Sequence, residues 1–384
     1  MRSELADQRL QPVRNLATNP SFETAGAVTT VRTNLCVNPN FEAGVAGWTA
    51  QSSTIVASTA QKRSGAQSLL ATLTAADRAG TFTSFTQTVE AVYTLSAWVF
   101  APVSITVRAA YTKGTVTSGG AATVIPAGVW TRISATGTAT NATGYLSVIT
   151  TVAPAADTLM YVDDVLLEAS PALGADFNGS TAAAGDFTYA WSGTVNASTS
   201  LQQGLSVAGA SNSANAHVQS TEWASTGTRS IRIIPTTSAT TSVVYPAGTS
   251  GVTLGMAAGK TYTVIAKCRL AAALTGTLRN DSRSIVLVHD DDGITSTTAS
   301  SAAPNAAGET VLRLTATLSA SASKAFFYLS NGSSAGNGDV WWDDLMIVEG
   351  VYVGDYGDGN TPGWRWDGDS EASTSTGYPS LSRP

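Results

Sequence analysis

The sequence is poor in charged residues, histidine and cysteine, and each shortage excludes a class of protein. Only 12% of the 384 residues are charged, the formal net charge is −6, and Lys and Arg form no cluster. Nucleic acid is therefore not an expected partner, because its phosphate backbone demands a basic face. The two cysteines, Cys36 and Cys268, are too few for a disulfide framework or a cysteine-based metal site. The two histidines, His217 and His289, stand outside any Ser-His-Asp pattern.

The sequence also offers no long apolar run of the kind that crosses a membrane. The uncharged stretch 91–107 is rich in Ser and Thr and contains Pro102, which is typical of two strands rather than a membrane-spanning helix. The first residues, MRSELADQRLQPV, include no apolar segment resembling a signal peptide. We therefore expect no membrane insertion, no secretion signal and synthesis in the cytoplasm.

What the chain does have is a composition suited to β-sheets. Hydrophobic residues make up 43% of it, and Thr, Ser, Ala, Val and Gly dominate while Leu, Glu and Lys are scarce. Small and β-branched residues favour strands, and Gly, Ser and Asn favour the turns between them. A length of 384 residues is typical of two or three domains.

Two ten-residue stretches indicate that the chain is a duplicated module. WSGTVNASTS (191–200) and WDGDSEASTS (366–375) both read Trp-x-Gly-x-x-x-Ala-Ser-Thr-Ser. Further matches occur upstream in the same order, among them YVDDVLLEAS (161–170) with WWDDLMIVEG (341–350). One such match is weak, but several in one order indicate a tandem duplication with insertions in its loops.

Each copy alternates between two faces with the period of a strand. In 93–100, Leu95 and Val99 share one face, and in 262–269 the corresponding face includes Cys268 as a small core residue. Many short strands, turn-rich connections and the lack of a convincing helix predict an all-β fold of antiparallel two-sheet sandwiches.

The repeats divide the chain into five predicted parts, in which each sandwich is followed by a short β-hairpin-like appendage. The parts are an N-terminal segment (1–31), a first sandwich (32–173), a first appendage (174–200), a second sandwich (201–350), and a second appendage with the C-terminal tail (351–384).

The opening strand of the module appears twice before the first complete copy. RNLATNPSFE (14–23) and RTNLCVNPNFE (32–42) repeat each other, and we call them the first and second heads. The sequence gives no reason for this repeat beyond a spare strand that covers a sheet edge or pairs with a neighbouring protein.

Four motifs of the first copy resemble one known family. They are NLCVNPNFEAGVAGWT (34–49), SGAQSL (64–69), YTLSAWV (93–99) and YVDDVLLE (161–168). Together they are similar to the galactose-binding-like jelly rolls of carbohydrate-binding modules. The resemblance covers 34–168 and is weaker over 201–350, which lacks the Asn-Pro-x-Phe-Glu opening. It implies two tandem antiparallel jelly-roll β-sandwiches that bind a ligand rather than catalyse.

The combination of repeated heads with the appendages resembles the minor tail proteins of phages that infect actinobacteria. This resemblance implies a non-enzymatic virion component at the tail tip, present as a homo-oligomer or in multiple copies, that binds host cell-wall glycan for host attachment. Its other partners would be further phage tail proteins, and the segment 1–31 would attach it to the tail. Two alternatives stay open: a purely structural tail protein without a ligand, and a glycan-cleaving tail enzyme, for which two binding modules leave no catalytic domain.

The jelly-roll resemblance also implies one structural calcium in the first copy. Its ligands would be the carboxylates of Glu42 and Asp163 with backbone carbonyls near Asn40 and around Arg63, since a hard cation takes several oxygens. The alternative is that Glu42 and Asp163 are exposed strand-end carboxylates. In the second copy Asp343 matches Asp163, but no Glu there matches Glu42.

A sugar-binding surface is predicted where aromatic and basic side chains face away from the core. Trp98 and Phe100 oppose the core face of their strand, and Arg108 opposes the apolar residues beside it. These three are the predicted ligand residues, with the alternative that Trp98 fills the gap between the two sheets. The second copy has Lys267 at the position of Trp98, so the two copies are not expected to share one ligand site.

Two motifs that imitate functional sites are better explained by turns. VHDDDG (288–293) predicts a charged hairpin turn, because a calcium loop of the EF-hand type needs alternate ligands and a distant Glu. GSSAG (332–336) matches the nucleophile elbow of hydrolases, but strand-forming sequences flank it where the elbow needs a helix. Ser334 is therefore not expected to be a nucleophile.

Each appendage carries two aromatic residues spaced by two, Tyr189 with Trp191 and Trp364 with Trp366. Such residues lie on one side of a strand, and a short hairpin cannot stand alone. We expect them to pack on the preceding sandwich or, alternatively, on a neighbouring subunit or tail protein.

Overall fold

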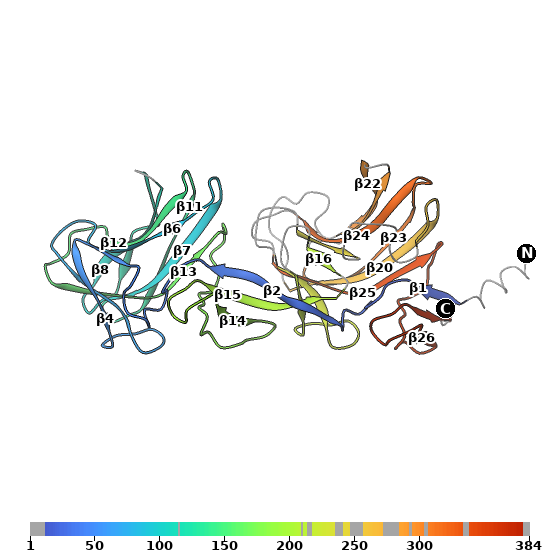
Figure 1. Ribbon diagram of the computed structural model, residues 1–384, viewed down its shortest axis with the longest axis horizontal. Coiled ribbons are helices and arrows are strands. Elements are labelled where there is room, and N and C mark those ends of the chain that lie inside the picture. Colours follow the sequence, from blue (N-terminus) through green and yellow to red (C-terminus); the bar gives the residue numbers. More distant parts are fainter. Residues whose placement is uncertain are drawn as a thin grey trace, which may run out of the picture. The chain divides into compact units, whose positions relative to one another are not determined.

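The structure consists of strands arranged in two compact units (Figure 1). The computed structural model describes residues 12–378, apart from 114–115, 209, 213–216, 235–240, 246–255, 272–283, 292–293, 303–305 and 333–337. The described residues form no helix, which confirms the predicted all-β fold, and thus none that could cross a membrane. One unit is Thr30–Gln203 and contains jelly roll 1, and the other is Met1–Thr29 with Gly204–Pro384 and contains jelly roll 2.

Jelly roll 1 consists of two antiparallel sheets around a hydrophobic core. The β7 sheet has the strand order β11 (Thr131–Thr138), β7 (Val92–Phe100), β13 (Thr158–Glu168), β5 (Ser68–Leu73) and β4 (Ser53–Ser58). The β8 sheet has the order β10 (Thr123–Ile125), β8 (Ile105–Lys113), β12 (Thr143–Thr150), β6 (Gly80–Thr86) and β3 (Thr49–Gln51), with β9 (Val116–Gly119) also paired to β8. The core between them is built from alternate residues, such as Leu95 and Val99 of β7, which confirms the predicted alternation.

Jelly roll 2 repeats this arrangement. Its β20 sheet has the order β17 (His217–Ser220), β18 (Ser230–Ile233), β25 (Val340–Glu349), β20 (Thr261–Leu270) and β23 (Gly308–Thr317). Its other sheet has the order β16 (Ser211–Asn212), β19 (Thr241–Tyr245), β24 (Ala322–Gly332), β21 (Ser284–Asp291) and β22 (Ile294–Ala302). Cys268 is fully buried in the core as predicted, and Cys36 is buried in jelly roll 1, so both cysteines are free thiols of separate cores. The predicted turns at 292–293 and 333–337, with Ser334, lie outside the described residues.

The first head belongs to jelly roll 2, although jelly roll 1 follows it in the sequence. Strand β1 (Val13–Asn15) pairs with β27 (Ser375–Gly377), which in turn pairs with β26 (Trp364–Trp366). In Figure 1 the blue β1 therefore lies among the red C-terminal strands. This corrects the prediction of a separate segment over 1–31, because the first head supplies the opening that 201–350 lacks.

A buried asparagine ties each head to its own body. Asn15 Nδ2 donates to the carbonyls of Leu345 and Gly357 at 3.4 and 3.3 Å, and Asn15 Oδ1 accepts from the amides of Ala17 and Ile347, both at 3.0 Å. All its hydrogen-bonding capacity is thereby used inside the protein. Asn34 makes the matching bonds in jelly roll 1, with the carbonyls of Val165 and Phe177 and the amides of Cys36 and Leu167.

The head strand also forms part of each appendage, which is a three-stranded sheet rather than a hairpin alone. In the first appendage the strand order is β14 (Thr188–Trp191), β15 (Ser200–Val207) and β2 (Ala25–Asn34). In the second, Trp364 packs against a cluster that includes Ile265, Met346 and Val348 of the preceding sandwich, as predicted. Tyr189 instead packs on Phe177 of its own appendage.

The shared ten-residue frame folds each appendage back on itself. Trp191 and Trp366 begin the frame, and they stand over Gly179 and Gly359, where any Cβ would meet the indole. Each indole nitrogen donates at 3.1 Å to the residue after that glycine, which is Ser180 in the first appendage. Within the frame, the amides of Gly193 and Gly368 donate to Ser198 Oγ and Ser373 Oγ at 3.0 Å, so the repeated Trp, Gly and Ser make local contacts.

Candidate ligand-binding sites

Two adjacent carboxylates, Asp163 and Asp164, lie at a bulge in β13. The pairing with β7 shifts after Asp163, and Asp164 has a φ of 45°, which Asp tolerates better than most residues. Asp163 Oδ2 accepts from the amides of Arg63 and Ser64 at 2.9 and 3.3 Å, and its Oδ1 accepts from the amide of Asp164 at 2.8 Å. Asp163 is fully buried, and this burial raises its pKa to about 7 in spite of the three N–H donors.

Glu42 holds the same loop from the second head. Its Oε1 accepts from the amides of Ala66 and Gln67 at 2.7 and 2.9 Å. Gly65 precedes these amides with a φ of 61°, and a Cβ there would meet Glu42 Oε1. We call Glu42, Asp163 and the loop amides that they accept the carboxylate lock of jelly roll 1. The lock fastens the opening segment and the closing strand β13 to one loop.

Jelly roll 2 has the same lock, and its glutamate comes from the first head. Glu23 Oε1 accepts from two loop amides at 2.7 and 2.8 Å, and Asp343 Oδ2 accepts from two more at 2.6 and 3.2 Å. Burial raises the pKa of Asp343 to about 8. The prediction that the second copy has no match for Glu42 is therefore wrong, because the matching Glu23 precedes both copies in the sequence.

The amide N–H groups that face the lock carboxylates are not ligands for a calcium ion. Calcium needs several oxygens directed at one point, whereas the loop beginning at Arg63 turns amide N–H groups toward both Glu42 and Asp163. The side chain of Asn40, beside the carbonyls predicted as ligands, donates from Nδ2 to Asn196 Oδ1 at 2.9 Å. Among the described residues, no three His, Cys, Asp or Glu side chains come together in a way that could hold a metal. Calcium at Asn40, Glu42, Arg63 and Asp163 stays a prediction for solution measurements.

Trp98 and Phe100 face away from the core, as predicted, but other side chains cover them. The Arg63 guanidinium lies 3.8 Å from the centre of the Trp98 ring, and Trp98 Nε1 donates to Asp176 Oδ1 at 3.1 Å. Phe100 is only 9% exposed and packs on Trp130, with ring centres 5.5 Å apart. Trp98 thus fills a gap between the β7 sheet and the first appendage, and not the gap between the two sheets.

Arg108 lies on the other sheet, so the three predicted ligand residues do not share one surface. Phe82 of β6 and Tyr145 of β12 occupy the same outer side of the β8 sheet, and their rings meet edge to face at 6.1 Å. Tyr145 is 36% exposed. Arg108 Nε is buried and has no hydrogen-bond partner in the described part of the chain, and its side chain lies against Gly119 of β9. We call Phe82, Arg108 and Tyr145 the β8 face.

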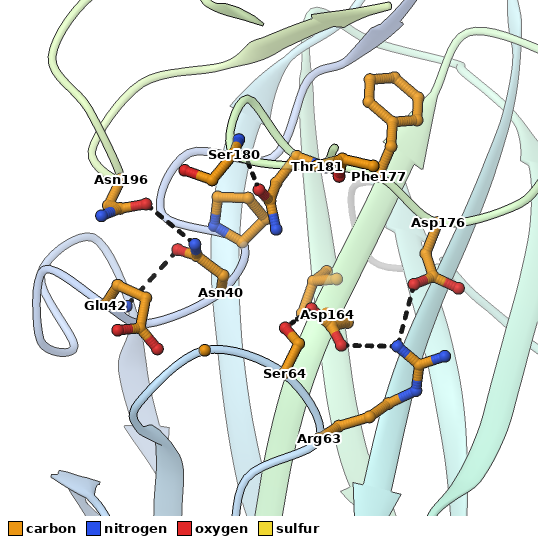
Figure 2. Close-up of a pocket in the computed structure, with 14 residues that line it drawn as sticks. Asn40, Glu42, Arg63, Ser64, Asp164, Asp176, Phe177, Ser180, Thr181 and Asn196 are labelled. Atoms are coloured by element: carbon orange, nitrogen blue, oxygen red, sulfur yellow. Dashed lines mark hydrogen bonds and ion pairs between the residues drawn. The ribbon is translucent and has the colours of Figure 1, made fainter. Parts of the chain in front are cut away.

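A pocket of about 480 Å³ lies where the first appendage meets loops and the β13 bulge of jelly roll 1 (Figure 2). The structure brings three of the predicted calcium residues into its wall, Asn40, Glu42 and Arg63, while Asp163 is buried behind it. Sequence reasoning missed the opposite wall, which comes from the first appendage. That wall consists of Asp176, Phe177, Asn178, Ser180, Thr181 and Asn196.

The signal for this missed wall is the motif DFNGST (176–181), which the second copy repeats as DYGDGNT (355–361). The motif forms a tight turn in which Asn178 Oδ1 accepts from the Ser180 amide at 2.8 Å and Thr181 Oγ1 accepts from the Asn178 amide at 2.9 Å. The repeat points to a conserved turn geometry within this chain, but it does not reveal where the turn docks.

Several solved structures of carbohydrate-binding modules are similar to the chain. The tandem CBM22-1–CBM22-2 domain of Paenibacillus barcinonensis Xyn10C is 14% identical with a TM-score of 0.32, over 86% of this chain and 100% of that one. The C-terminal family 22 module of Clostridium thermocellum Xyn10B is 16% identical with a TM-score of 0.31, over 35% of this chain and 94% of that one. TmCBM61, solved with β-1,4-galactotriose, is 16% identical with a TM-score of 0.28, over 35% and 97%. No protein-family model and no curated protein matches the chain.

Proposed function

We propose that the chain is a non-catalytic glycan-binding protein that holds a sugar on the β8 face. The observation that carries this proposal is the Phe82–Tyr145 ring pair, with Tyr145 36% exposed, on the side of the β8 sheet that also carries Arg108. A sugar ring presents C–H groups on one face and hydroxyls at its edge. It therefore binds where an aromatic ring lies beside a directional hydrogen-bond donor.

The register of the three central strands supports this geometry. Ser147 of β12 lies between Phe82 and Ala110, and Tyr145 lies beside Ser84, all on the outer side of the sheet. Ile149 of β12 lies on the same side opposite Arg108, and Ala110, Ser147 and Ile149 are all buried. The exposed part of this side includes Tyr145 and Ser84, which offer a ring and a hydroxyl to a sugar.

We further propose that this binding serves a phage, with the chain as a minor tail protein at the tail tip. The support is the sequence resemblance of the repeated heads and the appendages to such proteins. In this proposal the partners are other tail proteins and host cell-wall glycan, and several copies are present in each virion. Mass spectrometry and immunogold labelling of purified particles test this assignment, which fails if the chain is absent from the particles.

The glycan proposal is tested by sedimentation of the purified chain with insoluble bacterial cell wall. We expect Tyr145→Ala and Arg108→Ala each to weaken binding by roughly tenfold, which corresponds to about 1.4 kcal/mol. Tyr145→Phe should retain binding, because the stacking ring remains. Tyr378→Ala is the matched control, since Tyr378 is an exposed aromatic residue, 58% exposed, of the other unit.

Two results would favour the alternatives. If neither the wild type nor any variant sediments with cell wall, the chain is a structural protein without this ligand. If the wild type releases soluble sugar from the wall, and substitution of a single carboxylate abolishes that release, the chain is an enzyme.

A further inference from the structure

We infer that the pocket beneath the first appendage is a second ligand site, which takes a neutral or amino-bearing sugar residue and excludes acidic sugars. The inference concerns a different part of jelly roll 1 from the β8 face, so either site can fail without the other. It depends on the pocket walls, the way they are held, their charge and the contrast with jelly roll 2.

The pocket has walls from two segments that are remote in sequence (Figure 2). Asn40 and Ser64 belong to loops of jelly roll 1 and Asp164 to the bulge of β13, while Asn178 and Thr181 belong to the first appendage. Ten of the fourteen residues that line the pocket have side chains that can donate or accept hydrogen bonds. The volume of about 480 Å³ lies within the range of roughly 300–1,000 Å³ found for small-molecule sites.

Contacts between the walls fix these polar groups before any ligand arrives. Arg63 Nη1 lies 2.7 Å from Asp164 Oδ2 and 3.2 Å from Asp176 Oδ2, and the guanidinium is stacked on Trp98. Figure 2 shows Arg63 reaching from its loop to both carboxylates. A side chain held on three sides loses little freedom on binding, so its remaining hydrogen-bonding capacity is available to a ligand at low entropic cost.

The charge of the lining selects the ligand. Glu42, Asp164 and Asp176 contribute three carboxylates, and Arg63 is the single cationic residue of the lining. An anionic sugar would meet a net negative wall and be repelled, because like charges raise the cost of binding. Sugar hydroxyls and ammonium groups donate to carboxylates and amide oxygens, so neutral and amino sugars match this lining.

Jelly roll 2 shows that the fold does not require these residues. It has Ser21, Ser225 and Glu371 where jelly roll 1 has Asn40, Arg63 and Asn196. Ser21 Oγ donates to Glu371 Oε2 at 2.8 Å, which replaces the bond between Asn40 and Asn196. Glu371 has a φ of 59° and Asn196 one of 60°, so the backbone accepts either residue. The specific pocket chemistry of jelly roll 1 is thus not a by-product of closing the appendage.

The repeat supplies a test variant that the fold already tolerates. The double variant Asn40→Ser/Asn196→Glu gives jelly roll 1 the residues of jelly roll 2 and should keep the bond across the pocket. We would record saturation-transfer difference NMR of the full chain with glucose, galactose, mannose, arabinose, xylose, glucosamine, galactosamine, glucuronate and galacturonate. At least one neutral or amino sugar should bind, no uronate should bind, and the double variant should weaken binding by roughly tenfold. Tyr378→Ala, which alters an exposed ring of the other unit, should leave this binding unchanged.

Three results would overturn the inference. They are the binding of no neutral or amino sugar, the binding of a uronate that the double variant abolishes, and binding that survives the double variant at the wild-type level. If Tyr145→Ala abolishes sugar binding while the double variant retains it, the pocket inference fails and the β8-face proposal stands. Thermal unfolding of the double variant serves as the control for folding.

Discussion

At the scale of single residues, Asp163 and Asp343 are buried acids whose environment disfavours the ionised carboxylate. Both side chains are fully buried, and burial raises their pKa values to about 7 and about 8. The neighbouring carboxylates Asp164 and Asp344 raise them further. Each amide that donates to them lowers the pKa, but burial outweighs this effect. The two locks are therefore expected to be sensitive to pH.

The sign of this pH dependence follows from linkage. The pKa of each acid is higher in the folded state than in the unfolded state. The two acids therefore stabilise the fold fully below pH about 4, and this stabilisation is lost as pH rises through about 7 to 8. We expect the unfolding temperature to fall between pH 5 and pH 9. Calorimetry at several pH values measures this change, and Asp163→Asn/Asp343→Asn should flatten the profile even though it lowers the overall stability. A wild-type unfolding temperature that rises over this range would contradict the prediction.

Gly65 is required by space as well as by backbone conformation. Its φ of 61° already disfavours a side chain, and an added Cβ would meet Glu42 Oε1. Gly44 offers a matched control, since its φ is 86° but an added Cβ would meet nothing within 4 Å. We expect Gly65→Ala to lower the free energy of unfolding by about 2 kcal/mol more than Gly44→Ala, because the lock loses its acceptor geometry. Urea denaturation of both variants measures the difference, and equal losses would show that the lock contributes little.

The carboxylate lock also predicts the response to metal removal. Because loop amides satisfy Glu42 and Asp163, neither calcium nor an excess of EGTA should shift the unfolding temperature of the chain. Calorimetry with and without EGTA provides the measurement. A fall in the unfolding temperature on chelation, restored by calcium, would instead support a calcium ion at Glu42 and Asp163, with the loop turned to present its carbonyls.

At the scale of elements, one buried asparagine links each head strand to its own body. Asn15 joins β1 to β25 and to the second appendage, and Asn34 joins β2 to β13 and to the first appendage. Replacing either one with Ala leaves buried amides and carbonyls without partners, which costs roughly 2–4 kcal/mol. Asn15→Ala should therefore destabilise jelly roll 2, and Asn34→Ala should destabilise jelly roll 1.

Amide hydrogen exchange with mass spectrometry distinguishes these two effects. Protection should fall in 204–378 for Asn15→Ala and in 30–203 for Asn34→Ala. Asn15→Asp is a useful comparison, since it keeps the acceptor and loses the donor. A uniform loss of protection in both units from either variant would contradict the assignment of each head to its own body.

The periodicity of single strands was enough to predict much of this architecture. The alternation in 93–100 and 262–269 correctly predicts which residues enter the core, including Cys268, because burial of alternate residues is a local property of a strand. The docking of the appendages is not local. Trp98 correctly faces away from the core, yet Asp176 covers it from 78 positions farther along the chain, and no period in the sequence reports such a contact.

The candidate site was predicted only in part for the same reason. Asn40, Glu42 and Arg63 do lie together in one pocket, since they belong to motifs that the family resemblance already groups. Their partners from the appendage could not be assigned from the sequence. The role of Glu23 was also hidden, because the loop whose amides it accepts from lies some 200 positions farther along the chain. Two nearly identical heads in succession do not reveal which body each one completes.

At the scale of the whole molecule, the chain is nested rather than strictly tandem. The first head is followed by all of jelly roll 1 and its appendage before the rest of jelly roll 2 begins. The chain therefore passes from one unit to the other twice, in β2 and again in β15. The unit Thr30–Gln203 is continuous and contains its own head, whereas the other unit is assembled from both ends of the chain.

This nesting predicts how fragments of the chain fold. The fragment 30–203 should fold alone and unfold cooperatively, because it retains Asn34 and Glu42. The fragment 204–384 should not, since it lacks Asn15, Glu23 and the core side chain of Phe22.

Joining residues 12–29 to the start of 204–384 through a Gly/Ser linker should restore a cooperative urea transition and near-ultraviolet circular dichroism. Joining 31–48, which carries the second head, is the matched control, and its shared Asn and Glu should restore folding less completely because its side chains evolved beside another core. If 204–384 alone unfolds with the same midpoint as the rejoined fragment, the first head is dispensable and the nested assignment is wrong.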